Sequence, residues 1–273
     1  MTSPAARQHP EEQPFAEFPE LVLRAMTRHG VVPSRGYVTL EHDEALVSHY
    51  PDQPDRPFVV HWTHAERDPA DVFADLTAYL LDRGARSAEW WFRDDSTPAG
   101  LEDLVLEAGA TTVEDQVCVA RAVDGSLPPI APGVRVTLVQ DQQGIDAVIG
   151  IGAEVFGNPV PADPQAYLAE VLDDLDQARS AWVVGWVDGE PVGRASVGFE
   201  WQVAPLVGAA VLPHARRRGV YAAMLAARLD LAATAHCHTA ITKARRIGSL
   251  PLLLREGFVP IGRERAHLLE LAR

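Results

Sequence analysis

The sequence predicts an α/β fold of the α+β type, with a mixed β-sheet flanked by helices, in a chain divided into two domains. Segments with strand periodicity alternate with segments of helical periodicity along most of the 273 residues. The stretch DGSLPPIAP at residues 124–132 is rich in Pro and Gly, which is typical of an interdomain linker. We therefore expect a disordered tail at residues 1–15, a first domain at 16–123 and a second domain at 133–273.

The elements of the first domain follow from turn and helix-start signals. Pro- and Asp-rich turns separate short strand-like runs, and DPAD at residues 68–71 marks the start of a helix. The expected elements are a helix at 16–30, strands at 37–40, 45–48 and 58–62, a helix from 68 to about 83, a strand at 87–92, a helix at 98–107 and a strand at 112–120.

The second domain contains a strong hairpin signal, Asp188-Gly189-Glu190, between two apolar strand-like runs. The expected elements are a strand at 134–139, helices at 144–156 and 164–175, strands at 181–187 and 191–197, a central strand at 207–212, a helix that ends near 235, a strand at 239–242, a helix at 250–256, and a closing strand or pair of strands at 259–271.

Composition and charge exclude several classes of protein. No run of 18 apolar residues predicts a membrane span, the first residues lack a signal-peptide core, and the two cysteines form no disulfide or metal pattern. We therefore expect a cytoplasmic protein, monomeric or homodimeric, that does not bind membranes. The formal net charge is −14, yet residues 214–273 contain 11 Lys+Arg and 4 Asp+Glu. The acidic body argues against nucleic acid as a partner and favours a cationic one, and the basic end suits a polyanionic ligand.

The stretch between residues 207 and 235 has the pattern of an anion site. Pro213 ends an apolar strand-like run, three arginines and Gly219 form a turn, and an Ala- and Leu-rich helical pattern follows. The free N–H groups and the positive dipole end of such a helix favour phosphate. The other interpretation of the basic residues is a solvated helix face.

This stretch resembles motif A of the GNAT superfamily of acyl-CoA-dependent N-acetyltransferases, whose pyrophosphate loop reads Q/R-x-x-G-x-G/A. The chain has Arg216-Arg217-Arg218-Gly219-Val220-Tyr221, with Tyr221 where the family usually has Gly or Ala. The resemblance implies a GNAT fold over about 133–273 and acetyl-CoA as co-substrate, without a metal. The implied cofactor-binding residues are Ala210, Val211 and Leu212 on the central strand, Arg216, Arg217, Arg218, Gly219, Val220, Tyr221 and Ala222 in the loop, and Ser249.

A second family motif is similar to residues 246–258, which end in Gly257-Phe258. Compared with N-x-x-A-x-x-L-Y-x-K-x-G-F, the family's Tyr falls on Leu253, so the tyrosine that often protonates the leaving thiolate is missing. Leu104, Leu106, Gly109 and the strand after them repeat the spacing of Leu252, Leu254, Gly257 and the strand after them. The first domain is therefore interpreted as a degenerate GNAT-like module, against the alternative of a chance match between α/β sequences.

Two residues are candidates for catalysis. Amine acetylation needs a base that removes a proton from the attacking amine and donors for the oxyanion. The central strand carries no ionisable group, so Glu200 is the best candidate base, and Ser249, a helix N-cap by position, is the candidate donor to the thiolate. Weaker candidates are His214 at the turn, Glu154 and Tyr167 near the acceptor, and Arg245 and Arg246 for the 3′-phosphate of CoA. His236-Cys237-His238 is not expected to bind a metal.

These observations predict an N-acetyltransferase that moves an acetyl group from acetyl-CoA to a primary amine of a small molecule or peptide by direct attack. The acidic balance favours a cationic acceptor. A non-catalytic acyl-CoA-binding sensor or scaffold, and an acyltransferase that uses a longer acyl-CoA, remain alternatives.

Overall fold

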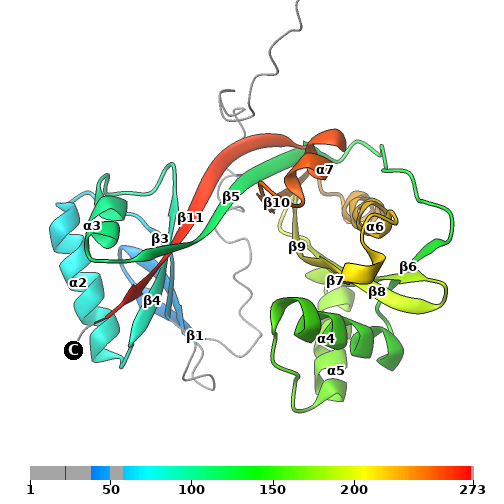
Figure 1. Cartoon of the computed structure of the whole chain (residues 1–273), viewed down its shortest axis with the longest axis horizontal. Helices are drawn as coiled ribbons and strands as arrows, with labels where there is room; N and C mark the ends of the chain where they lie inside the picture. The colour runs from blue at the N-terminus through cyan, green and yellow to red at the C-terminus, as the bar shows by residue number, and fades with distance from the viewer. Residues whose placement is uncertain (1–21, 23–37, 50–57, 272–273) are drawn as a thin grey trace, which may run out of the picture.

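The computed structural model describes residue 22, residues 38–49 and residues 58–271, which form one eleven-stranded mixed sheet with helices on its faces (Figure 1). The strands are β1 (Val38–His42), β2 (Ala45–His49), β3 (Phe58–Thr63), β4 (Ser87–Arg93), β5 (Thr111–Ala122), β6 (Val134–Leu138), β7 (Ser180–Val187), β8 (Glu190–Gly198), β9 (Val203–Val211), β10 (Thr239–Arg245) and β11 (Val259–Glu270). The helices are α2 (Pro69–Asp82), α3 (Leu101–Glu107), α4 (Gln142–Phe156), α5 (Pro164–Asp176), α6 (Val220–Thr234), α7 (Leu250–Arg255) and the 3-10 helix η2 (Pro213–Ala215). The predicted mixed sheet flanked by helices is confirmed.

The strand order shows that the two halves of the chain exchange their last strands. The order is β1-β2-β3-β4-β11-β5-β10-β9-β8-β7-β6. The last strand, β11, therefore pairs with β4 of the first half, and β5 pairs with β10 of the second half. In Figure 1, β5 and β11 form an arch that connects a lobe with α2 and α3 to a lobe with α4 to α7. The domain boundary at residues 124–132 stays a prediction, and the sheet is continuous across it.

The outer parts of the two halves share one arrangement. In the first half, β1 and β2 form an antiparallel pair, β3 joins it antiparallel, and α2 then connects β3 to the parallel strand β4. In the second half, β7, β8 and β9 are antiparallel neighbours, and α6 connects β9 to the parallel strand β10. The second half has in addition β6, α4 and α5 before its hairpin.

Each lobe buries its own apolar side chains between helices and sheet. In the first lobe, Val72, Leu76 and Leu80 of α2 are fully buried against strands β2 to β4. In the second lobe, α4 and α5 cover Trp182, Val184 and Trp186 on one face of β7. Val183 and Val187, which alternate with these residues, point to the other face, where α6 packs. None of the described helices is long and apolar enough to cross a membrane.

Most predicted elements are present, with differences that have local causes. β9 begins at Val203, four residues before the predicted start, because Pro205 lies inside the strand and obscures it. The helix expected from residue 98 begins only at Leu101, after Gly100 in a left-handed conformation. The closing segment is one strand with register shifts, not a pair of strands. The expected helix at 16–30, apart from Val22, and the tail at 1–15 lie outside the described residues.

Candidate functional site

The turn between β9 and α6 presents a helix N-terminus that no side chain caps. Gly219 occupies the position before α6 with a φ of 82°, and no side-chain hydrogen bond is made at this cap. Arg217 is also left-handed, with a φ of 62°. The N–H groups of the first helical turn have no intrahelical acceptor, and they lie at the positive end of the helix dipole. This geometry is suited to a phosphate group.

The three arginines of this turn are exposed. The Nε of Arg216 donates to the carbonyl oxygen of Val211, 3.2 Å away at the end of β9. The Nη2 of Arg218 lies 2.9 Å from a carboxylate oxygen of Asp188, in the turn between β7 and β8. Exposed ion pairs are weak. Arg218 can therefore leave Asp188 for a phosphate at little cost.

The predicted linker lies directly against this turn. A Cβ atom added to Gly219 would lie 2.6 Å from the Cβ of Ala131. At the end of the linker the chain makes a local turn, in which the Val134 N–H donates to the Ala131 carbonyl at 3.2 Å. Glycine is thus needed at position 219 both for its backbone conformation and for the approach of the linker. A larger residue there would disturb the linker as well as any bound phosphate.

Beside the turn, β9 separates from β10. The two strands pair only at Val203↔Thr239, Ala204↔Ala240 and Pro205↔Ile241. One further link follows, a 2.8 Å hydrogen bond from the Thr242 hydroxyl to the Leu206 carbonyl. Beyond it, β10 continues beside β5 and β9 continues beside β8. The expected cofactor residues Ala210 and Val211 lie on this separated part of β9.

A bulge in β9 accompanies the separation. Ser196 of β8 pairs with Val207, but Arg194 pairs with Ala210, so β9 has one extra residue between these pairs. Gly208 within the bulge has a φ of 63°, and a Cβ there would be 3.2 Å from the Trp182 ring. The bulge redirects the end of β9. The N–H of Leu212, another expected cofactor residue, is already used by the Val192 carbonyl at 2.8 Å.

Ser249 lies at the N-cap position of α7, yet its side chain makes no capping hydrogen bond. Its φ and ψ of −76° and −27° are helical, whereas a capping serine normally has extended geometry. The hydroxyl is therefore not committed to the helix. Leu253, at the position of the missing tyrosine, is fully buried in the core under α7.

Glu200 lies at the opposite end of β9 from the arginine turn. It forms an isolated antiparallel bridge with Val203 in the turn that precedes the strand. Gly208, in the bulge, is five residues after Val203, which corresponds to roughly 16 Å of extended strand. The structure thus separates Glu200 from the bulge, while Gly219, the arginines and the free edge of β9 lie at one end of the strand.

The weaker candidates already have partners or face solvent. The Nε2 of His214 is 3.5 Å from a carboxylate oxygen of Glu190, and both side chains are exposed. Glu154 is exposed on α4, and Tyr167 packs on the α4–α5 core. The arginines before α7 form ion pairs with β5: Arg245 with Glu114, and Arg246 with Asp115.

Among the described residues, no group of three or more His, Cys, Asp or Glu is placed to hold a metal ion. In the segment His236-Cys237-His238, which is not expected to bind a metal, Cys237 is buried. The prediction that no metal is needed remains a prediction.

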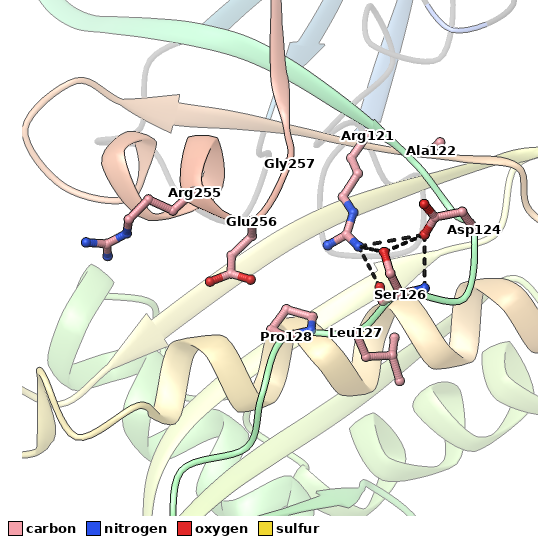
Figure 2. A pocket seen from close by; sticks show the side chains of 9 residues that line it. All are labelled: Arg121, Ala122, Asp124, Ser126, Leu127, Pro128, Arg255, Glu256 and Gly257. Atoms are coloured by element: carbon pink, nitrogen blue, oxygen red, sulfur yellow. Dashed lines mark hydrogen bonds and ion pairs between the residues drawn. The ribbon is translucent and has the colours of Figure 1, made fainter.

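A cavity of about 400 Å³ lies away from the arginine turn, between the linker and the end of α7 (Figure 2). On the linker side, Arg121 donates through Nη2 to the carbonyl and the hydroxyl of Ser126, both at 2.5 Å. Arg255 and Glu256, at the end of α7, line the other side, and the guanidinium of Arg255 points away from Arg121 (Figure 2). No sequence pattern predicts this cavity, because its residues become neighbours only when β5 enters the second lobe.

Two buried arginines were also not anticipated. Arg194 of β8 is 6% exposed, and its Nη1 donates to the Val148 carbonyl of α4 at 3.0 Å. Arg228 of α6 is 1% exposed. Its position among alanines and leucines, seven residues after Tyr221, is the only sequence signal that could have identified it, because an i, i+7 pair shares one helix face.

Residues 150–258 match the model of the family described as "Acetyltransferase (GNAT) family". This part of the chain is a GNAT-family domain. The matched residues contain the arginine turn, the separated strands β9 and β10, and α7. No curated protein matches the sequence.

Several solved structures share the fold over most of the chain. A GCN5-related N-acetyltransferase from Kribbella flavida is 20% identical with a TM-score of 0.65, covering 92% of this chain and 96% of that one. A GCN5-related N-acetyltransferase from Sphaerobacter thermophilus is 17% identical with a TM-score of 0.65, covering 86% and 83%. A tandem GNAT protein from the clavulanic acid biosynthesis pathway is 12% identical with a TM-score of 0.59, covering 87% and 84%. At these identities the likeness establishes the GNAT fold.

Proposed function

We propose that this protein is an N-acetyltransferase that transfers an acetyl group from acetyl-CoA to a primary amine of a small molecule or peptide. The observation that carries the proposal is the uncapped N-terminus of α6 next to the separated strands β9 and β10. The first feature suits the diphosphate of CoA, and the second offers a free strand edge to its amide-containing arm. The GNAT-family match over residues 150–258 supports the same assignment.

In the proposed reaction the neutral amine attacks the thioester carbonyl in a ternary complex. A C–N bond forms, the C–S bond breaks, the nitrogen loses a proton and the thiolate gains one. On the free edge of β9, the N–H of Val211 would be a donor for the oxyanion, whereas the N–H groups of Ala210 and Leu212 are on the side of the strand that pairs with β8. The Ser249 hydroxyl is proposed as the donor to the thiolate, because it is not used in capping α7. Glu200 remains the proposed base, and because its distance from the bulge is too great for one bridging water, proton transfer to it would need a chain of waters.

Release of CoA in the presence of acetyl-CoA and an amine panel tests the function. A thiol reagent can follow it directly, because Cys118 and Cys237 are both buried and burial raises the pKa of the Cys118 thiol to about 12. We expect amine-dependent CoA release. Ser249→Ala should lower kcat about tenfold while Tm stays unchanged. A loss of Tm with unchanged kcat would assign Ser249 to the helix instead.

We propose that the acceptor is cationic, since the chain carries a formal net charge of −14. Polyamines, aminoglycosides and basic peptides should be acetylated with higher kcat/KM than neutral or acidic amines, and the preference should weaken as salt is added. Turnover restricted to neutral or acidic amines would overturn this assignment.

The alternatives predict different results in the same assays. A sensor or scaffold would be stabilised by acetyl-CoA yet show neither turnover with any amine nor slow hydrolysis. An acyltransferase for longer acyl groups would bind succinyl-CoA or a longer acyl-CoA more tightly than acetyl-CoA in one binding assay.

We propose that the first half is a degenerate GNAT-like module without a CoA site of its own. Its strands β1 to β4 and helix α2 follow the arrangement of β7 to β10 and α6. At the start of α2, however, the Asp68 carboxylate accepts a 2.8 Å hydrogen bond from the Ala70 N–H. This helix end is thus occupied by the protein's own anion, which would repel a phosphate. A stoichiometry of one CoA per chain is expected.

A further inference from the structure

Arg228 is a buried cation in the middle of α6. At 1% exposure its N–H groups need acceptors from the protein. Nε donates to the Met224 carbonyl one turn earlier, at 3.3 Å, and Nη1 reaches the Ser196 carbonyl of β8 at 3.5 Å. Nη2 has no hydrogen-bond partner within the described part of the chain. Backbone carbonyls, and not a carboxylate, thus hold this guanidinium.

Tyr221 is the side chain that accompanies this cation. It lies seven residues before Arg228, on the same face of α6, and its ring centroid is 5.9 Å from the guanidinium carbon. Burial lowers the pKa of Arg228, and the neighbouring Tyr221 offsets part of this effect. Tyr221 is also the position at which the loop departs from the small residue of the resembling motif. The unusual residue of the loop and the buried cation are therefore neighbours.

Arg228 contacts the sheet at the bulge. Arg228 reaches the carbonyl of Ser196, and Ser196 pairs with Val207 of β9. Val207 is the last paired residue before the bulge, which contains Gly208 and Ala209. The Ser196 hydroxyl also donates to the Val207 carbonyl at 3.4 Å. Arg228 thus fixes the strand segment next to the point where β9 turns away from β10.

We propose that Arg228 and Tyr221 are a positioning pair for acyl-CoA. Arg228 holds the Ser196 carbonyl and so fixes the bulged edge of β9, and Tyr221 holds Arg228 in place. The pair connects the turn that would bind the diphosphate to the strand edge that would bind the pantetheine arm. This inference rests on the proposed function, because it assigns a role within the same site.

Calorimetric titration with CoA tests the pair. We expect Arg228→Met to weaken CoA binding at least tenfold, Arg228→Lys to retain affinity within about threefold, and Tyr221→Leu, which removes the aromatic ring, to weaken binding three- to fivefold. Because the two residues act as one unit, the double variant Tyr221→Leu/Arg228→Met should bind no more weakly than Arg228→Met. Asp230→Ala, an exposed change on the same helix, is the matched control and should bind as the wild type does.

A second ligand separates positioning from general stability. Adenosine 3′,5′-bisphosphate lacks the pantetheine arm, so its affinity should be unchanged in Arg228→Met, whereas partial unfolding would weaken both ligands. Wild-type CoA affinity in Arg228→Met, equal loss for both ligands, or additive losses in the double variant would overturn the proposal. If Arg228→Met does not fold, wild-type affinity in Tyr221→Leu would overturn it. Failure of the wild-type protein to bind CoA would instead refute the proposed function.

Discussion

At the scale of single residues, burial decides what a titratable side chain can do. His61 of β3 is half-buried, and its Nε2 lies 2.7 Å from the Ser48 hydroxyl of β2. Burial, and after it the positive charge of Lys243, lowers the pKa of His61 to about 4. The imidazole is therefore neutral at pH 7 and serves as a hydrogen-bonding group in the first lobe.

This lowered pKa predicts a loss of stability in mild acid. The unfolded chain binds a proton at His61 below about pH 6.5, while the folded chain does not until about pH 4. Stability is therefore complete above pH 6.5 and falls as the pH drops towards 4, by about 1–2 kcal/mol between pH 7 and pH 5. Urea unfolding at both pH values measures it. His61→Gln should lose this part of the pH dependence, while His64→Gln, at an exposed residue, should keep it.

Of the residues in the candidate site, some could be predicted from the sequence and others could not. The arginine turn and Gly219 could be predicted, because a strand, a basic glycine turn and a helix follow one another locally. The buried arginines could not, since the sequence does not say which side of a helix or strand a lone arginine faces. The chemical roles of Glu200 and Ser249 stay predictions. The structure adds that Ser249 does not cap α7 and that Glu200 lies at the far end of β9.

At the scale of elements, the contact between the linker and the arginine turn carries a consequence for mutagenesis. Gly219→Ala adds a side chain to a left-handed residue, which costs about 1–2 kcal/mol, and places its Cβ 2.6 Å from the Cβ of Ala131. We expect the free energy of unfolding to fall by about 2–3 kcal/mol in total. A substitution at Gly219 therefore cannot test phosphate binding in isolation.

The two contributions can be separated with a second variant. Ala131→Gly removes the atom that Gly219→Ala would meet, so the double variant should recover the steric part and retain the cost of the backbone conformation. Denaturant unfolding of both single variants and of the double variant measures this. Equal stability of Gly219→Ala and the wild-type protein would contradict the described turn geometry.

Element boundaries were largely predictable, and the exceptions have physical reasons. Alternating burial in β4 and the Asp188-Gly189 turn agree with local sequence patterns. Pro205 concealed the start of β9, since a proline is unexpected inside a sheet. Pro205 nevertheless pairs with Ile241 of the parallel strand β10, and β9 continues on both sides of the proline.

At the scale of the whole molecule, the exchange of β5 and β11 binds the two halves together. β11 has neighbours on both sides, β4 and β5, and β5 lies between β11 and β10. No local pattern could have predicted this, because a strand's neighbours are set by long-range pairing. Sequence patterns predicted where both strands lie along the chain but not which strands they pair with.

The exchange predicts that the halves remain associated when the linker is cut. A protease site inserted after the exposed Leu127 would break the chain between β5 and β6. The cleaved protein should elute as one species in gel filtration and separate only in denaturant, because the sheet pairs both fragments through β4, β11, β5 and β10. Separation of the fragments in buffer would contradict the continuous sheet.

A crystal structure with acetyl-CoA bound tests the central claim most directly. We predict that the diphosphate accepts hydrogen bonds from backbone N–H groups between Gly219 and Ala222, with the pantetheine arm along β9 beside Ala210 and Val211. Density for the diphosphate in the cavity between the linker and α7, against Arg121 and Arg255, would contradict the proposed site.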